Sequence, residues 1–203
     1  MSKSRIISLA SLVDKDSSVL DIGTDHAYLP IYLIKNNICK NVTASDISKN
    51  VLEYSKKNII KYNMEDKIKL VLSDGFSNIT DEFDIAVIAG MGFNTIKKIL
   101  DTDKLPNKLI IQCNNDLDLL RSFMNKINYK ILNEVVVKDK GIYYVIIKYG
   151  KGKEILNTNE LEFGISENLD YYNYLLLKYS NVNTDFFKEK KERLKEFIER
   201  IQD

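Results

Sequence analysis

The sequence predicts an α/β protein with a mostly parallel sheet covered by helices on both faces, one antiparallel strand at the sheet edge, and a C-terminal antiparallel helical hairpin. Apolar strand patterns alternate with helical patterns from residue 18 to residue 127, which is typical of a parallel sheet with helical crossovers. The last two strand patterns, 131–137 and 142–147, are joined by the turn Lys138-Asp139-Lys140-Gly141, which predicts a hairpin. Beyond residue 159, apolar residues recur at helical spacing.

The individual elements follow one another with short connections. An amphipathic helix is expected in residues 1–13, and a later helix over 28–34 tolerates Pro30 in its first turn. Ser48 is the expected N-cap of a third helix, whose apolar side includes Leu52 and Ile59. The remaining helices are expected at 94–100 and 117–127, and the strands at 18–22, 42–46, 68–72, 83–89 and 109–112.

Two domains are expected, a catalytic domain over 1–150 and a linker with a helical domain over 151–203. Residues 150–159 are polar, contain two glycines and lack periodicity, so they are expected to form the linker. The connection at 181–183 lies between two helical patterns and is short, so these two helices are expected to lie antiparallel as a hairpin. Thr184 is the expected N-cap of the last helix, and the two apolar faces are expected to hold Leu169, Tyr172, Leu176 and Tyr179, and then Phe187, Leu194, Ile198 and Ile201.

Composition limits the functional classes. With 203 residues and 44% hydrophobic residues, the chain can bury a sizeable core, and its sequence holds no run of eighteen apolar residues that would predict a membrane span. Cys39, Cys113 and the single histidine are isolated, so we expect no metal site, and two buried thiols fit a cytoplasmic location. The net charge of +1 means that a nucleic acid would require a local basic patch, and no obligate protein partner is evident.

Four expected strands end in residues suited to ligand binding. The segment 21–26 (Asp-Ile-Gly-Thr-Asp-His) follows the first strand, Asp46 ends the second, Asp74-Gly75 follows the third, and 90–92 (Gly-Met-Gly) follows the fourth. In an open parallel sheet, ligands bind beyond the carboxyl ends of the strands, near the point where the strand order reverses. Taken one at a time, such acids also serve as helix caps and such glycines as turns.

Each of these residue types suits one part of a charged nucleoside. Gly23 lets the backbone approach a ligand closely, Asp46 can accept from ribose hydroxyls, and Asp74 can accept from an adenine amine. An acid in the first loop can face a cationic amine or a sulfonium. The sequence has neither G-x-G-x-x-G nor G-x-x-x-x-G-K-[ST], which argues against dinucleotides and nucleoside triphosphates. S-adenosylmethionine remains, and with it a Rossmann-like, class I methyltransferase sheet.

Two motifs carry a more specific resemblance. The segments 21–30 (DIGTDHAYLP) and 88–92 (IAGMG) resemble the bacterial tRNA (adenine-22-N1)-methyltransferases, the TrmK family, and the similarity runs from about residue 4 to residue 164. The resemblance implies a Rossmann-like catalytic domain followed by a coiled-coil-like helical domain. It also implies methylation of N1 of adenine 22 in the D-arm of tRNA, with S-adenosylmethionine as donor.

A few positions depart from the family pattern. Thr24 stands where serine is more usual, and Asp46 stands where many members have glutamate; both changes keep the functional group. Phe93 replaces a second glycine, so we expect it to change the shape of the adenine pocket. Residue 94, an asparagine, replaces a small residue.

The residues at the strand ends are expected to serve in catalysis, in binding the adenine base and in binding the cofactor. Adenine N1 carries a lone pair, so we expect in-line attack on the sulfonium methyl with no strong base, on an adenine extruded from the tRNA arm. Asp25 and then His26 are the catalytic candidates, which would orient the adenine and stabilise its cationic character. Tyr28, Met91 and Gly92 are expected around the base, and the cofactor residues are Asp21, Gly23, Thr24, Asp46, Ile47, Asp74, Gly75, Ala89 and Gly90.

Several alternatives stay open at this point. His26 could cap the following helix, Tyr28 could belong to the core, and the charged run 188–200 could be a solvated helix face or an RNA-binding patch. The acceptor could be another RNA or a small molecule. The chain could also be a noncatalytic tRNA-binding protein that retains the sheet, although the four clustered acids Asp21, Asp25, Asp46 and Asp74 count against this reading.

Overall fold

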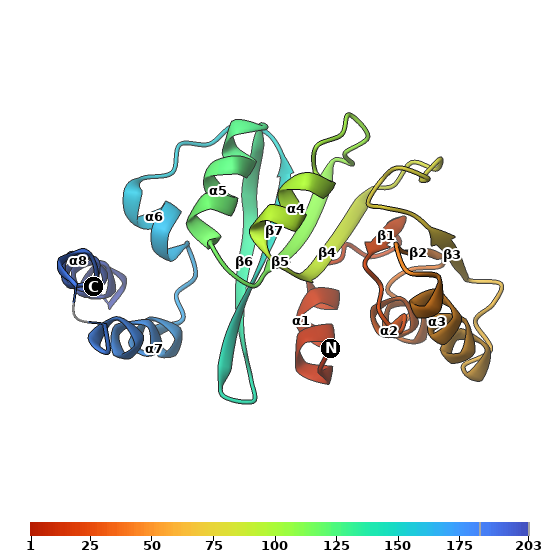
Figure 1. The fold of residues 1–203 in the computed structure, drawn as a ribbon, viewed down its shortest axis with the longest axis horizontal. Helices are drawn as coiled ribbons and strands as arrows, with labels where there is room; N and C mark the ends of the chain where they lie inside the picture. Colours follow the sequence, from red (N-terminus) through yellow and green to blue (C-terminus); the bar gives the residue numbers. More distant parts are fainter. Residues whose placement is uncertain (183, 203) are drawn as a thin grey trace.

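A seven-stranded sheet forms the centre of the computed structural model, which describes residues 1–182 and 184–202 (Figure 1). Asn183, in the predicted connection, and Asp203 lie outside the described residues. The strands are β1 (Val19–Ile22), β2 (Val42–Asp46), β3 (Ile68–Leu72), β4 (Ile85–Met91), β5 (Lys108–Cys113), β6 (Tyr129–Asp139) and β7 (Ile142–Lys151). The helices are α1 (Lys3–Ser11), α2 (Tyr28–Lys35), α3 (Lys49–Lys61), α4 (Phe93–Ile99), α5 (Leu117–Lys126), α6 (Thr158–Phe163), α7 (Leu169–Ser180) and α8 (Asp185–Gln202).

The strand order is β3-β2-β1-β4-β5-β7-β6, and the first five of these strands are parallel. The expected single antiparallel strand is β7, which pairs with β5 on one side and with the outermost strand β6 on the other. Strand β1 lies between β2 and β4, so the chain order reverses there. In such sheets the crevice for a ligand opens beyond the carboxyl ends of the two strands at the reversal, here β1 and β4.

Alternate residues of the strands point to two separate cores, which confirms a sheet covered on both faces. On one face, Val19, Val87 and Ile110 pack with α1, α2 and α3. On the other face, Leu20 and Ile88 pack with α4, α5 and the C-terminal helices. Helices α1–α3 and helices α4–α5 therefore cover opposite faces.

Two predicted boundaries were wrong. Strand β4 continues through Gly90 and Met91 beyond the predicted end at 89, because Met91 still pairs with Cys113 across a register shift. Residues 150–159 are not a continuous linker, since β7 runs to Lys151 and α6 begins at Thr158. The sequence signal for α6 is a capping box. The Asn157 side chain accepts from the backbone N–H of Glu160, and the Glu160 side chain accepts from the backbone N–H of Asn157.

The C-terminal helices are tied to the sheet by a buried ion pair. Arg121 of α5 and Glu134 of β6 are fully buried and lie 2.9 Å apart (Nη2 to Oε2). Arg121 also donates to the carbonyl of Leu161 at 3.0 Å, and Glu134 accepts from the N–H of Ile165 at 3.3 Å. These bonds fix the end of α6, from which the chain continues into α7.

Helices α7 and α8 pack together at the end of the molecule far from β3 (Figure 1). Tyr172, Tyr179 and Leu194 are buried as expected, whereas the predicted Leu169 and Leu176 are half-buried and Tyr171 and Leu175 are buried in addition. The division of the chain into domains at residue 150 stays a prediction. Among the described residues, none of the helices has the length and apolarity that crossing a membrane requires.

Candidate active site

The four predicted strand ends surround a cavity of about 420 Å³ at the carboxyl edge of the sheet. We call it the cofactor cavity, and it is lined by Ile22, Gly23, Asp46, Ile47, Ser73, Asp74, Gly75, Met91, Asn94, Thr95, Lys98 and Ile99. A much smaller cavity adjoins it through Gly23 and is lined by Met1, Asp21, Thr24, Asp25, Tyr28, Leu29 and Ala89. The strand topology therefore brings together acids and glycines that are far apart in the sequence.

The first loop, residues 23–27, bends sharply between β1 and α2. Gly23 has φ +74°, a backbone conformation that residues with a Cβ rarely adopt, and a Cβ there would also displace Cε of Met91, so glycine is favoured at this point. The N–H groups of Gly23 and Thr24 donate to the Ser45 carbonyl of β2 at 2.8 and 3.0 Å. Ser55 of α3 donates to the carbonyl of Asp25 at 2.5 Å. Neighbouring elements thus hold the loop backbone in place.

Asp21 lies beneath this loop rather than at its surface. Its carboxylate accepts a hydrogen bond from the Thr24 hydroxyl at 2.7 Å, and the residue is only 6% exposed. Burial raises the pKa of Asp21 to about 6, the Thr24 hydrogen bond opposes that rise, and the negative charges of Asp46 and Asp25 add to it. Asp21 therefore shapes the loop while carrying a charge that the surroundings disfavour.

This pKa gives stability a specific pH dependence. The pKa of Asp21 is about 6 in the folded protein and 3.8 ordinarily, so between these values the folded state binds more protons than the unfolded state. The free energy of unfolding should therefore fall by about 3 kcal/mol as the pH rises through this window. Asp21→Asn should abolish the fall and be about 2 kcal/mol more stable than wild type above it, measured by urea unfolding. An unchanged pH profile in this variant would contradict the assignment, and Asp66→Asn, at an exposed position, is the control.

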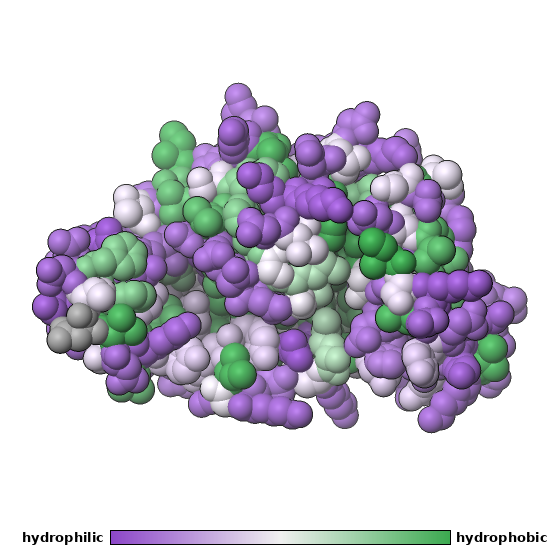
Figure 2. All heavy atoms as spheres, in the orientation of Figure 1, coloured by the Kyte–Doolittle hydropathy of each residue, from purple (hydrophilic) through white to green (hydrophobic). Residues whose placement is uncertain are grey.

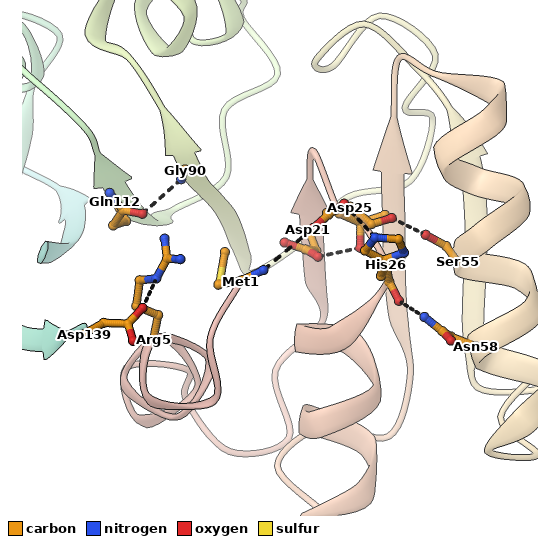
Figure 3. A network of polar contacts seen from close by, with 11 residues as sticks. Met1, Arg5, Asp21, Asp25, His26, Ser55, Asn58, Gly90, Gln112 and Asp139 are labelled. Carbon is orange, nitrogen blue, oxygen red and sulfur yellow. Dashed lines mark hydrogen bonds and ion pairs between the residues drawn. The ribbon is translucent and has the colours of Figure 1, made fainter. Parts of the chain in front are cut away.

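Asp25 and His26 form the outer part of the first loop (Figure 3). The Asp25 carboxylate lies 3.8 Å from the Met1 ammonium and 3.5 Å from Nε2 of His26, so its position suits a cationic group. The His26 ring packs 5.4 Å from the Tyr28 ring and 5.9 Å from the Tyr54 ring. Ala27 is the N-cap of α2 and no side chain caps that helix, so His26 is not the helix cap.

Asp46 and Asp74 line the cofactor cavity from β2 and from the turn after β3. Oδ1 of Asp46 accepts from the N–H of Ser48 at 2.8 Å, which fixes the orientation of the carboxylate. Asp74 lies 3.3 Å from Nζ of Lys98 of α4. Apolar side chains of Ile22, Ile47 and Ile99 complete the wall between these polar groups.

A polar network at the ends of β4 and β5 was missed by the sequence analysis. Gly90 donates its N–H to Gln112 Oε1 at 3.1 Å (Figure 3). Gly90 also accepts from Asn114 Nδ2 at 2.8 Å, and Gln112 donates to Asn114 at 3.0 Å. Asn115 accepts from the N–H of Phe93 at 3.1 Å. The signal was the polar run that ends the apolar strand β5, but only the pairing of β4 with β5 places it against Gly90.

The predicted site residues do not all meet at the two cavities. Eleven of the fourteen line one of them, whereas His26, Gly90 and Gly92 line neither. Tyr28 is 41% exposed and is therefore not a core residue. Phe93 is buried in the core against Phe123, with ring centroids 6.2 Å apart, and lines neither cavity, so its expected effect on the adenine pocket stays a prediction. Asn94, its neighbour, lines the cofactor cavity instead.

Two cavities larger than the cofactor cavity lie elsewhere. One of about 860 Å³ runs along α4 and α5, and one of about 610 Å³ lies beside the start of β5. We assign the site by the meeting of strand ends rather than by size, because the topology directs ligands to that edge. Within the described part of the chain, no group of three His, Cys, Asp or Glu side chains could hold a metal ion.

Comparison with known proteins agrees with this geometry. Residues 2–147 match the family described as methyltransferase domain. A protein of Mycoplasma genitalium that is provisionally named a tRNA methyltransferase is 37% identical over 160 residues, which cover 75% of this chain and 71% of that protein. The tRNA (adenine(22)-N(1))-methyltransferase of Bacillus subtilis is 31% identical over 148 residues, 70% of this chain and 62% of that enzyme.

A solved structure extends the similarity to the whole chain. The TrmK protein of M. capricolum, in complex with S-adenosyl-homocysteine, superposes with a TM-score of 0.81 and 31% identity, over 100% of this chain and 96% of that one. The C-terminal helices are therefore shared, as well as the sheet. The chain belongs to the methyltransferase-domain family and, within it, to the TrmK tRNA methyltransferases.

Proposed function

We propose that this protein methylates N1 of adenine 22 in the D-arm of tRNA, with S-adenosylmethionine as the methyl donor. The observation that carries the proposal is the cofactor cavity, which Asp46 and Asp74 line from the ends of β2 and β3, beside the point where the sheet order reverses. The acceptor follows from the Bacillus subtilis relative, whose name states that position. We infer a cytoplasmic location because the proposed substrate is tRNA.

The residues of the cavity suit S-adenosylmethionine. Asp46 would accept from the ribose hydroxyls and Asp74 from the adenine amine, while Ile22, Ile47 and Ile99 offer apolar surface to the purine. Gly23 leaves room for close approach of the backbone, with Asp21 and Thr24 fixing the loop beside it. Gly75 and Ala89 would contact the ligand from the strand ends. When bound, this donor supplies an electrophilic methyl group on a sulfonium centre.

The chain's own contribution to the reaction is orientation and charge stabilisation. N1 of a neutral adenine carries a lone pair, so no residue has to remove a proton from it before the bond to the methyl carbon forms. The methylated ring is cationic, and the carboxylate of Asp25, which lies 3.8 Å from the Met1 ammonium, would stabilise that charge. Met91 and Gly92, together with the Gly90 backbone held by Gln112 and Asn114, would border the base opposite Tyr28.

Asp25→Asn and His26→Ala should differ in their effect. We expect Asp25→Asn to lower kcat about tenfold, because it removes the charge while keeping the size of the side chain. His26→Ala should lower kcat less than threefold, since the ring packs at an angle against the Tyr28 and Tyr54 rings and lines neither cavity. Single-turnover methylation at saturating tRNA measures both, and a larger loss in His26→Ala would reverse the assignment.

The deciding experiment is transfer of labelled methyl from S-adenosylmethionine to unmodified tRNA, with adenine or guanine at position 22. Incorporation that depends on the adenine would support donor, acceptor and position together. Incorporation that survives the replacement would favour a different RNA position. Binding of S-adenosylmethionine without incorporation into either tRNA would overturn the proposal and favour a small-molecule acceptor or a noncatalytic tRNA-binding protein.

A further inference from the structure

A second groove, of about 320 Å³, lies between α1 and α2 and outside the cofactor cavity. We call it the tyrosine groove; it is lined by Met1, Lys3, Ile6, Tyr28, Ile31, Tyr32, Lys35 and Tyr62. Ile6 and Ile31 form its buried floor, whereas Tyr28 and Tyr62 are 41% and 43% exposed. Three tyrosine rings therefore stand in a groove that solvent reaches.

The chemistry of the tyrosine groove is aromatic and basic. Lys35 Nζ lies 5.8 Å from the centre of the Tyr62 ring. Lys3 of α1 also lines the groove, and the described lining includes no carboxylate. Aromatic faces combined with lysines are the features by which proteins bind unpaired nucleotides, since the bases stack and the phosphates need cations. A chain whose net charge is only +1 has to concentrate such cations locally.

The groove is continuous with the active site. Met1 and Tyr28 line both the tyrosine groove and the small cavity that contains Asp21 and Asp25. Helix α2 begins at Tyr28 beside the first loop and reaches Lys35 about 10 Å further along its axis. A strand that leaves the active site past Tyr28 would therefore run directly along Tyr32 toward Lys35 and Tyr62. Figure 2 shows hydrophilic side chains dominating the neighbouring surface over α2 and α3.

We propose that the tyrosine groove binds the tRNA nucleotides adjacent to the target adenine after that adenine has been extruded. Tyr62 stacks on an unpaired base, and Lys35 and Lys3 contact the phosphates that follow it. This inference rests on the proposed function, because it needs a tRNA in the site. It assigns substrate binding to the face of the sheet that carries α1 and α2, in addition to any contact made by the C-terminal helices.

Direct tRNA binding tests the groove. Fluorescence anisotropy with unmodified tRNA that carries adenine 22 should show Kd rising about tenfold for Tyr62→Ala, while Tyr62→Phe stays close to wild type because it keeps the ring. Lys35→Gln should weaken binding several-fold and lower the salt dependence by about one ion. Lys126→Gln, an exposed lysine on α5 at the opposite face, is the matched control and should change neither quantity.

A mutant cycle identifies the occupant. Abasic nucleotides are placed in turn at the two positions adjacent to adenine 22. At the position that Tyr62 contacts, Tyr62→Ala should no longer weaken tRNA binding, because there is no base left to stack. S-adenosylmethionine affinity, measured by calorimetry, should stay at the wild-type value in all variants. If the wild type methylates tRNA and both Tyr62→Ala and Lys35→Gln bind tRNA with unchanged affinity, the proposed role of the tyrosine groove is overturned, and the proposed function is not. A wild type that neither binds nor methylates tRNA would overturn the proposed function, and with it the proposed role of the tyrosine groove.

Discussion

Asp46→Asn is expected to weaken S-adenosylmethionine binding about 30-fold, which corresponds to about 2 kcal/mol. The variant keeps an oxygen that can accept from the N–H of Ser48, so the local turn at the start of α3 should survive. It loses the charge and one acceptor that the proposed contact with the ribose hydroxyls requires. Calorimetric titration of the cofactor measures the change.

Asp46→Glu separates charge from geometry. The TrmK family resemblance indicates glutamate at this position in many members, so this variant should bind within about threefold of wild type. Asp81→Asn is the control, because Asp81 pairs with Lys69 at 2.6 Å and does not line the cofactor cavity. Equal affinities for wild type and Asp46→Asn would remove Asp46 from the cofactor site.

Glu134→Leu should lower the free energy of unfolding by about 4 kcal/mol, because it leaves the guanidinium of Arg121 buried without its partner. It also removes the acceptor for the N–H of Ile165, just after α6. Since Arg121 and Glu134 connect α5 and β6 to the start of the C-terminal helices, we expect proteolysis to begin in α7 and α8. Urea unfolding and limited proteolysis measure the two effects.

The double variant Arg121→Met/Glu134→Leu provides the control for this buried pair. With both charges replaced by apolar side chains, more than half of the lost stability should return, although the carbonyl of Leu161 and the N–H of Ile165 lose their partners. Lys195→Ala, which breaks an exposed pair with Glu192, should leave stability nearly unchanged. A double variant less stable than Glu134→Leu alone would show that packing, not charge, dominates there.

The order of elements was predictable because each carries a local signal. The apolar runs of the strands, Ser48 as an N-cap and the turn before β7 are all encoded by neighbouring residues, and the structure has each of them. The short helix α6 was missed, since its six residues carry too little periodicity and only the capping box of Asn157 and Glu160 announces it. The placement of β7 between β5 and β6 depends on long-range pairing, which no local pattern specifies.

Some features of the active site were likewise predictable from the sequence, whereas others depend on the tertiary structure. The acids and glycines of 21–30 and 88–92 identified the family and the cofactor, because the backbone turns and charges that a nucleoside ligand needs are set by residue type. The tertiary structure decided which of them face the cavities, turned His26 outward onto two tyrosine rings, and buried Phe93. It also placed Gln112 and Asn114 against the Gly90 backbone, and it placed the tyrosine groove beside the small cavity that Asp21 and Asp25 line. Those relations depend on strand register and helix packing between distant segments, whereas the sequence by itself determines only what each segment offers.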